Sequence, residues 1–95
     1  MIVIGAGFGG IAVALRMRAR GYDVTLLDRL SAIGGRARVF ERGGFRHDAG
    51  PTVITAPFLF DELFGLFGEK REDHVEFRSL DPWYRFYFHT GEQFD

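Results

Sequence analysis

The chain of 95 residues contains no cysteine, which excludes a disulfide framework and thiolate chemistry. Neither sign of charge dominates, because 12 basic and 13 acidic residues leave a net charge of −1. This balance provides no basic surface, so nucleic acid is not expected as a partner. The three histidines, His47, His74 and His89, are too scattered to suggest a metal cluster, and no metal site is expected.

Long apolar runs are also missing, since none approaches the roughly 20 residues of a membrane-spanning helix. A glycine-rich turn at residue 5 leaves no room for a signal peptide, which favours a cytoplasmic protein. The chain is short enough to form at most one domain or part of one. Glycine and phenylalanine are plentiful, at 13 and 11 residues, and this pairing predicts tight turns beside a large apolar surface.

The first ten residues, MIVIGAGFGG, carry the main structural signal. A short apolar run over residues 2–4 is typical of a buried parallel strand, and glycines in the spacing G-x-G-x-x-G follow it directly. Helical periodicity then extends over residues 9–20, and a second strand is predicted over residues 23–28. The order of strand, crossover helix and strand predicts an α/β fold with a Rossmann-like βαβ unit.

The glycines of this turn are predicted to have different structural roles in a dinucleotide-binding site. Gly5 allows the turn, Gly7 lets a pyrophosphate approach the backbone, and Gly10 lets the helix pack on the strand. The backbone at Phe8 and Gly9 begins the helix, whose first N–H groups point at an anion. This context of strand, turn and helix makes the glycine spacing informative, because the spacing alone is a weak signal.

Asp28 ends the second strand, 18 residues after Gly10, where a dinucleotide site has its acidic residue. Its carboxylate is expected to accept hydrogen bonds from the ribose hydroxyls, and its charge argues against NADP. The alternative is a surface aspartate that ends a strand. Arg29 either lies over the adenine edge or is solvated.

Two further loops are candidates for cofactor contact. The glycine pair Gly34-Gly35 would let the backbone approach a cofactor, and Arg36 would neutralise its pyrophosphate; the alternative is a plain loop with a surface arginine. Gly50, Pro51 and Thr52 suit a chain that passes close to a flat ring, although they also read as a turn after a hairpin.

The remaining pattern is a hairpin, a helix and further strands. Thr55 is predicted to cap the N-terminus of this helix, and Pro57 is a proline typical of a helix start. The predicted elements are a hairpin of Ala37–Glu41 with Phe45–Asp48, a helix over 58–67, a charged surface connection over 69–74, alternating strands over 75–78 and 84–89, and a turn over 90–92.

These short strands leave sheet edges and apolar faces uncovered, which indicates an N-terminal fragment of a longer protein. The predicted division is a dinucleotide-binding part over residues 1–56 and the start of a substrate-binding region over residues 57–95.

Three stretches together resemble a known family: GAGFGGIAVALRMRARGYDVTLLD, IGGRARVFERGGFRHDAGPTVITAPFLFDELF and DPWYRFYFHTGEQFD. The chain resembles the amino-terminal segment of bacterial-type phytoene desaturases, which are flavoenzymes related to the amine oxidases. The resemblance implies FAD as cofactor, a long carotenoid polyene as substrate, and desaturation by hydride transfer to the flavin. It also implies a full enzyme several times longer, so that the 95 residues alone would be inactive.

The resemblance implies that Gly5, Gly7, Gly9 and Gly10 correspond to the family's pyrophosphate loop. It also implies that Asp28 corresponds to the ribose-binding acid, residues 34–36 to the GGR element, and residues 50–52 to the loop near the isoalloxazine. The family usually has glutamate where this chain has Asp28, and often proline where it has Ile33. No residue is named as catalytic, because His47 and Asp48 are only weak candidates for acid–base chemistry.

Several alternatives stay open at this point. A C30 carotenoid desaturase, a carotene isomerase, a ketolase or an amine oxidase would share the same cofactor segment. A prenyl-binding chaperone of the Rab GDP-dissociation-inhibitor type would share the fold without the flavin. The apolar helix over residues 58–67 either packs under a further domain or forms a membrane-facing entry for the lipid, with peripheral attachment to the inner face of the membrane.

Overall fold

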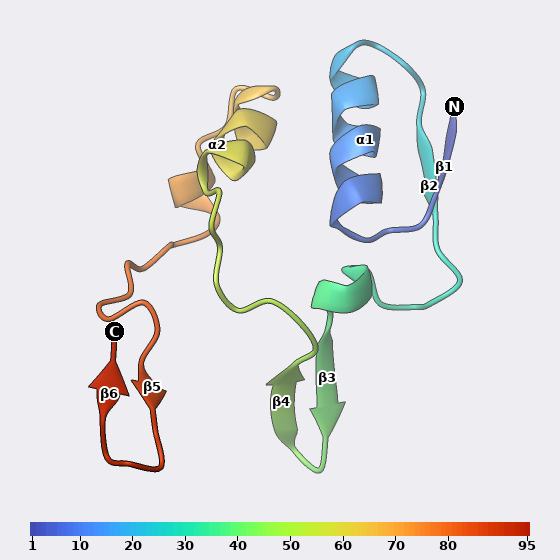
Figure 1. Ribbon diagram of the computed structural model, residues 1–95. Coiled ribbons are helices and arrows are strands. Elements are labelled where there is room, and N and C mark those ends of the chain that lie inside the picture. The colour runs from blue at the N-terminus through green and yellow to red at the C-terminus, as the bar shows by residue number, and fades with distance from the viewer.

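The computed structural model describes all 95 residues, which form a βαβ unit, a central hairpin, a second helix and a C-terminal hairpin (Figure 1). The two helices, α1 and α2, lie beside each other. The central hairpin lies below them in this view, and the C-terminal hairpin extends away from the rest. The chain is therefore elongated, with extents of 58 × 32 × 21 Å.

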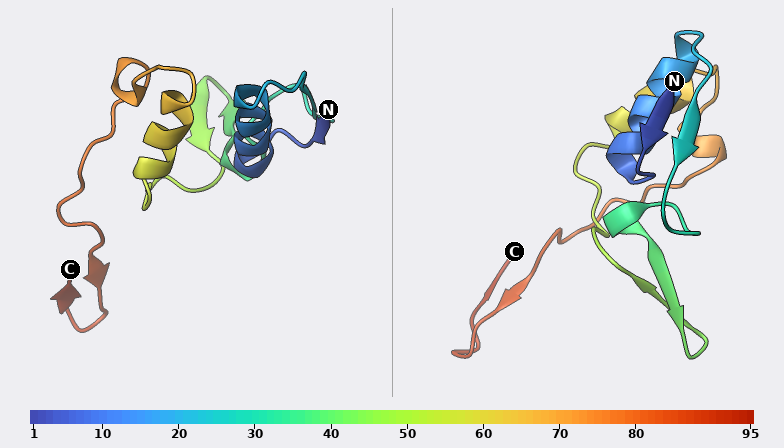
Figure 2. Two further views of the ribbon diagram at one scale, coloured as in Figure 1. Left: turned by 90° about the horizontal axis from the view of Figure 1, so that it is seen from above. Right: turned by 90° about the vertical axis from the view of Figure 1, so that its right-hand side faces the viewer.

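The order of strand, helix and parallel strand confirms the predicted βαβ unit, but the prediction of a buried first strand is wrong, since Ile2 and Ile4 are 66% and 86% exposed and nothing in the chain covers them. Strand β1 (Ile2–Ile4) runs parallel to β2 (Thr25–Leu27), with Ile2 opposite Thr25, and α1 (Phe8–Ala19) connects them. Figure 2 shows the two strands side by side next to α1. The second strand is shorter than predicted, because only residues 25–27 pair with β1.

Helix α1 is flanked by glycines at both ends. Gly7 is the N-cap residue, and at the other end Gly21 has a φ of +90° while Tyr22 N–H donates to the carbonyl of Met17 at 3.1 Å. The side chain of Arg16 connects α1 to the second helix, α2. Its guanidinium donates to Glu62 Oε1 of α2 at 2.9 Å, because α2 lies against this side of α1.

The central hairpin pairs β3 (Val39–Arg42) with β4 (Phe45–Asp48), and Gly43-Gly44 closes it. Both glycines have positive φ, the conformation of a type I′ turn. The predicted start of the hairpin at Ala37 is wrong. A 3₁₀ turn, η1 (Gly35–Ala37), precedes the strand, because the glycine pair turns the backbone tightly there.

Helix α2 (Phe58–Gly65) is shorter than the predicted span of 58–67, although its last turn continues to Gly68, where φ is +74°. The predicted cap at Thr55 is wrong. Pro57 is the N-cap residue, without a side-chain cap, and the carbonyls of Ala56 and Pro57 accept the first N–H groups. The fixed φ of proline starts the helix two residues after Thr55.

The connection over residues 69–74 contains a short 3₁₀ turn, η2 (Arg71–Asp73), and one of its charges is not at the surface. The Arg71 side chain is 12% exposed, donates to Asp61 Oδ1 at 2.7 Å and lies 4.4 Å from the centre of the Phe77 ring. The predicted strand over 75–78 is wrong. Phe77 packs edge-on against Phe60 of α2, and no strand pairs with this segment.

The C-terminal hairpin pairs β5 (Phe86–Tyr87) with β6 (Gln93–Phe94) around the predicted turn. The predicted strand over 84–89 is thus reduced to two residues. Arg85 and Asp95 close its open end, with two hydrogen bonds of 2.5 and 2.7 Å.

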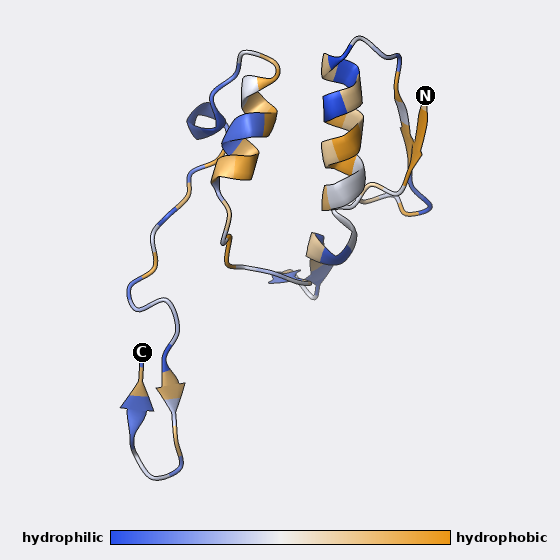
Figure 3. Cartoon of the chain, turned by 45° about the horizontal axis from the view of Figure 1, so that its top comes forward, coloured by the Kyte–Doolittle hydropathy of each residue, from blue (hydrophilic) through white to orange (hydrophobic).

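The chain has almost no interior of its own, since Ala6 is its one buried residue. Apolar side chains are exposed on the face of β1 away from α1, where Ile4 is 86% exposed, and along α2, where Phe58 is 65% exposed. Figure 3 shows these apolar segments of β1 and α2. None of the helices combines the length and the apolar character needed to cross a membrane.

Candidate functional site

Two glycine loops meet at the carboxyl end of β1. Gly34 N–H donates to the Ala6 carbonyl at 2.7 Å, and Gly7 and Gly34 form an isolated parallel bridge. Gly5 N–H donates to the Leu27 carbonyl at the end of β2, also at 2.7 Å. Both loops were predicted from the sequence, and in the structure they form one backbone surface.

Close backbone approach explains three of the glycines in this surface. A Cβ on Gly35 would lie 3.0 Å from the Gly7 Cα, and one on Gly50 would collide with the Arg36 carbonyl oxygen. A Cβ on Gly10 would collide with the Gly5 carbonyl oxygen, which is the predicted contact of helix on strand. These glycines are therefore needed for the loops to pack on one another.

Gly7 and Gly9 differ from them, because the protein leaves room for a side chain at both. A Cβ on Gly7 would make an ordinary contact of 3.8 Å with the Gly35 Cα, and one on Gly9 would meet nothing within 4 Å. Neither residue has a positive φ. The missing side chains thus leave a cradle at the start of α1 that a ligand can fill, where the helix N–H groups are free to bind an anion.

A cavity of about 980 Å³ lies over this cradle. Its volume lies within the range of about 300–1,000 Å³ that is common for ligand cavities. It collects residues from all three predicted loops and from the start of the central hairpin. Its lining comprises Gly7, Phe8, Gly9, Arg29, Leu30, Gly34, Gly35, Arg36, Ala37, Arg38, Phe40, Ala49, Gly50 and Pro51.

The lining is positively charged. It contains three arginines, Arg29, Arg36 and Arg38, and no carboxylate, and none of the three forms an ion pair within the chain. Five lining residues were not predicted from the sequence: Leu30, Ala37, Arg38, Phe40 and Ala49. The sequence predicted a strand that begins at Ala37, whereas the structure has the 3₁₀ turn η1 there. This turn brings Arg38 to the cavity.

Asp28 holds the glycine turn in place. Its Oδ2 accepts the Ala6 N–H at 2.7 Å and its Oδ1 accepts the Leu30 N–H at 2.8 Å. These two backbone hydrogen bonds, the Ala6 bond first, lower the pKa of the Asp28 carboxyl below its usual value. Each carboxylate oxygen has a second lone pair, so Asp28 can still accept a hydrogen bond from a ligand hydroxyl.

Four predicted site residues lie outside this cavity. Gly5 and Asp28 line a neighbouring hollow of about 530 Å³ at the carboxyl ends of β1 and β2, which shares Arg29 and Leu30 with the main cavity. Thr52 lines a separate cavity of about 780 Å³, between residues 52–57 and 76–83. Gly10 lines none of the three and acts through packing.

The two neighbouring hollows together suit a dinucleotide. The larger one offers a backbone cradle, a helix N-terminus and three guanidinium groups, which bind phosphates. The smaller one offers a carboxylate at the end of β2, where a ribose is bound in Rossmann-like folds. The lining of the larger hollow contains no carboxylate and no histidine.

Comparison with known proteins agrees with this geometry. Residues 3–69 match a family model described as an NAD(P)-binding Rossmann-like domain. This match extends past residue 56, and the division into parts 1–56 and 57–95 stays a prediction.

Curated relatives are similar over nearly the whole chain. A lycopene-forming phytoene desaturase of Pantoea ananas is 48% identical over 98% of the chain, and a neurosporene-forming phytoene desaturase of Rhodobacter capsulatus is 42% identical over 98%. A 4,4'-diaponeurosporene oxygenase of Staphylococcus haemolyticus is 38% identical over the full chain. The chain spans only 18–19% of the length of these relatives. With its βαβ unit, its glycine cradle and its matched residues 3–69, the chain belongs to the NAD(P)-binding Rossmann-like domain family.

Proposed function

We propose that this chain is the cofactor-binding part of an FAD-dependent carotenoid desaturase that converts phytoene towards lycopene. The observation that carries the proposal is the cradle at Gly7 and Gly9, which the protein's own packing does not require, beneath a cavity with three unpaired arginines. The relatives named phytoene desaturase support the substrate class. Both the substrate and the reaction belong to the whole protein.

The choice of FAD rests on the resemblance to flavoenzymes and on the charge at Asp28. This carboxylate is held ionised by two backbone N–H groups, and a 2′-phosphate would be repelled there. A dinucleotide with free ribose hydroxyls is therefore favoured over NADP. FAD meets this condition, and its diphosphate suits the arginine-lined cavity.

In this proposal each loop holds a different part of the cofactor. The Gly7 and Gly9 backbone and Arg36 hold the diphosphate, Asp28 accepts from the ribose hydroxyls, Arg29 lies on the adenine side, and residues 50–52 pass near the flavin ring. When bound, the flavin supplies a hydride acceptor for a substrate C–H bond. The residues of this chain bind and orient it, and none of them is assigned a proton-transfer role.

The proposal is tested by changing Gly7 in the full-length protein. The structure has room for the Gly7→Ala methyl group, so a loss of flavin would report on the ligand and not on the fold. An overpacked contact costs about 1–3 kcal/mol, which weakens FAD binding by about 5- to 150-fold, and Gly7→Val should be purified without flavin. Bound flavin is measured by absorbance after purification.

Gly65→Ala is the matched control, since Gly65 has open space around it and no positive φ. This variant should keep its flavin. A Gly7→Val protein that is purified yellow with full flavin content would disprove the proposed cradle.

The reaction itself is tested by expressing the full-length gene in a host that accumulates phytoene. Desaturation should produce coloured polyenes with the carbon skeleton of phytoene. A host that keeps only phytoene would contradict the proposed reaction.

A second candidate is a carotenoid oxygenase, which the similarity to the Staphylococcus haemolyticus relative favours. Because the cofactor segment is shared, the product distinguishes the two: an oxygenase adds oxygen to the polyene, and a desaturase removes only hydrogen. A colourless full-length protein would instead favour a prenyl-binding chaperone.

We also propose that the full-length protein is cytoplasmic and attaches peripherally to the inner face of the membrane. A long polyene is dissolved in lipid, so the enzyme must take it from a bilayer. The exposed apolar residues of α2, among them Phe58 and Leu59, suit this attachment.

A further inference from the structure

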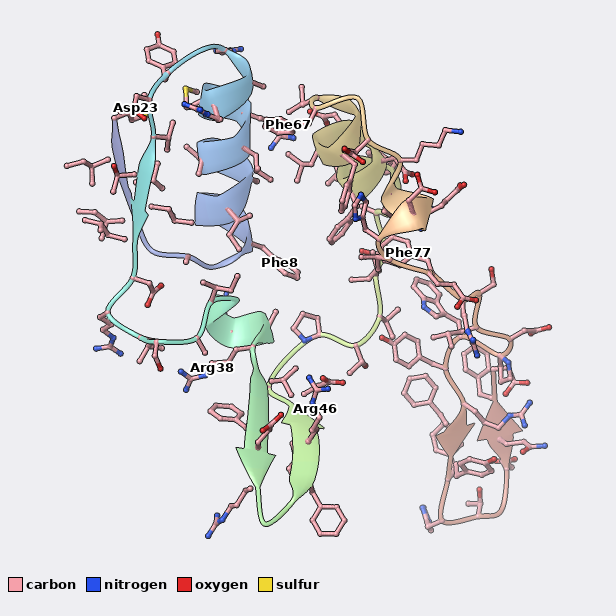
Figure 4. All side chains as sticks on the ribbon, turned by 180° about the vertical axis from the view of Figure 1, so that it is seen from behind. Phe8, Asp23, Arg38, Arg46, Phe67 and Phe77 are labelled. Carbon is pink, nitrogen blue, oxygen red and sulfur yellow. The ribbon has the colours of Figure 1, made fainter.

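Arg38 lies at the junction of η1 and β3 (Figure 4). It lines the same cavity as Gly7 and Gly9. Of the three arginines in that lining it alone is half-buried, while Arg29 and Arg36 are exposed. Partial burial makes a positive charge costly unless an opposite charge is supplied.

The chain supplies no opposite charge to Arg38. No carboxylate forms an ion pair with it, and its guanidinium lies over the Phe40 ring, whose centre is 4.3 Å from the guanidinium carbon. A ring face attracts the cation and restricts its position without neutralising it. Arg38 is therefore a restrained, uncompensated charge at the wall of the cavity.

The backbone of Arg38 is held from two sides. Its carbonyl accepts the Ala49 N–H at 3.0 Å, and a Cβ on Gly34 would lie only 3.2 Å from the Arg38 Cα. Both contacts come from loops that line the cavity. Such fixed placement lowers the conformational entropy that binding would cost.

We infer that Arg38 is a further phosphate-binding residue of this site, which neutralises the diphosphate of the bound dinucleotide together with Arg36. This inference rests on the proposed function, because it takes the cavity to be the cofactor site. It assigns the Phe40 ring a positioning role, as the platform that directs the guanidinium.

The inference is tested with the apo form of the full-length protein and two ligands. FAD is titrated by the quenching of its fluorescence, and ADP, which carries a diphosphate without flavin, is titrated as its competitor. Losing one charge-assisted hydrogen bond at a partly exposed site should make Arg38→Gln bind both about tenfold more weakly. The deficit should shrink as salt is added, and Arg38→Lys should restore part of the affinity.

Arg42→Gln is the control, because Arg42 lies in the same hairpin, is exposed, and does not line the cavity. It should bind both ligands like the wild type, and the apo forms of all variants should melt at one temperature. Wild-type affinity of Arg38→Gln, or a loss confined to FAD, would overturn the inference. So would an equal loss in Arg42→Gln.

The two proposals fail separately in this experiment. A wild-type protein that binds ADP but no flavin defeats the choice of FAD. The ADP titration then still decides whether Arg38 binds the diphosphate.

Discussion

At the scale of single residues, Asp28 links the second strand to the glycine turn. Its two oxygens each accept a backbone N–H, at 2.7 Å from Ala6 and 2.8 Å from Leu30. Asp28→Asn replaces one acceptor with an NH₂ group that faces a donor. We expect a lower melting temperature of the apo full-length protein and weaker FAD binding, measured by thermal unfolding and fluorescence titration. Asp28→Glu, which keeps the charge, should lower the melting temperature and the FAD affinity by less than Asp28→Asn does.

The pH dependence of this difference follows from the lowered pKa of Asp28. A carboxyl whose pKa is lower in the folded state stabilises the protein above its unfolded pKa of about 3.9, and this stabilisation is lost as the pH falls through the folded pKa. The difference in melting temperature between wild type and Asp28→Asn should therefore be largest near neutral pH and should disappear in acid. A gap that stays constant with pH would contradict the role of the charge.

At the scale of elements, α2 uses its two faces differently. The Phe60 ring packs edge-on against the rings of Phe8 in α1 and of Phe77, with ring centres 5.9 and 5.4 Å apart. The Phe64 ring stacks on the His74 ring, with ring centres 5.1 Å apart. Figure 4 shows Phe8 directed toward α2. Phe58 and Leu59 are 65% and 44% exposed. The exposed side chains of Phe58 and Leu59 are therefore available for a lipid surface, while Phe60 and Phe64 hold the helix in place.

This division predicts the result of a flotation experiment with liposomes. The full-length double variant Phe58→Ser, Leu59→Ser should keep its flavin and lose most of its liposome binding, because two exposed apolar side chains that would enter the bilayer are removed. The control, Phe60→Ser, should instead lower the melting temperature. Unchanged flotation of the double variant would refute α2 as the membrane contact.

At the scale of the whole molecule, the chain lacks the core of an independent domain. One of its residues is buried, and its radius of gyration is 17.4 Å, against about 12 Å for a compact domain of this length. The relatives that it matches are about five times longer. Further parts of a longer protein would cover apolar residues such as Ile4.

We therefore expect residues 1–95, expressed alone, to show no cooperative unfolding transition and to bind no flavin. Too little apolar surface is buried to offset the conformational entropy of ordering the chain. Circular dichroism during a urea titration would measure this. A sharp sigmoidal transition would contradict the prediction.

The sequence by itself determined the βαβ unit and the first glycine loop. These features depend on neighbours in the chain: an apolar run, glycines at fixed spacing, and helical periodicity up to Gly21. It also determined the position of Asp28 at the end of β2. Roles that depend only on local geometry, such as the turn at Gly5, could be predicted from the sequence.

Only the tertiary structure decided which loops meet and which side chains line the cavity. Gly35 packs on Gly7, and Gly50 packs on the Arg36 carbonyl, although each pair lies more than a dozen positions apart in the sequence. Arg38 reaches the cavity because a 3₁₀ turn replaces the predicted start of a strand. Arg16 and Arg71 are likewise held by partners on other elements. Contacts between distant segments depend on how the elements pack, and local periodicity carries no information about that packing.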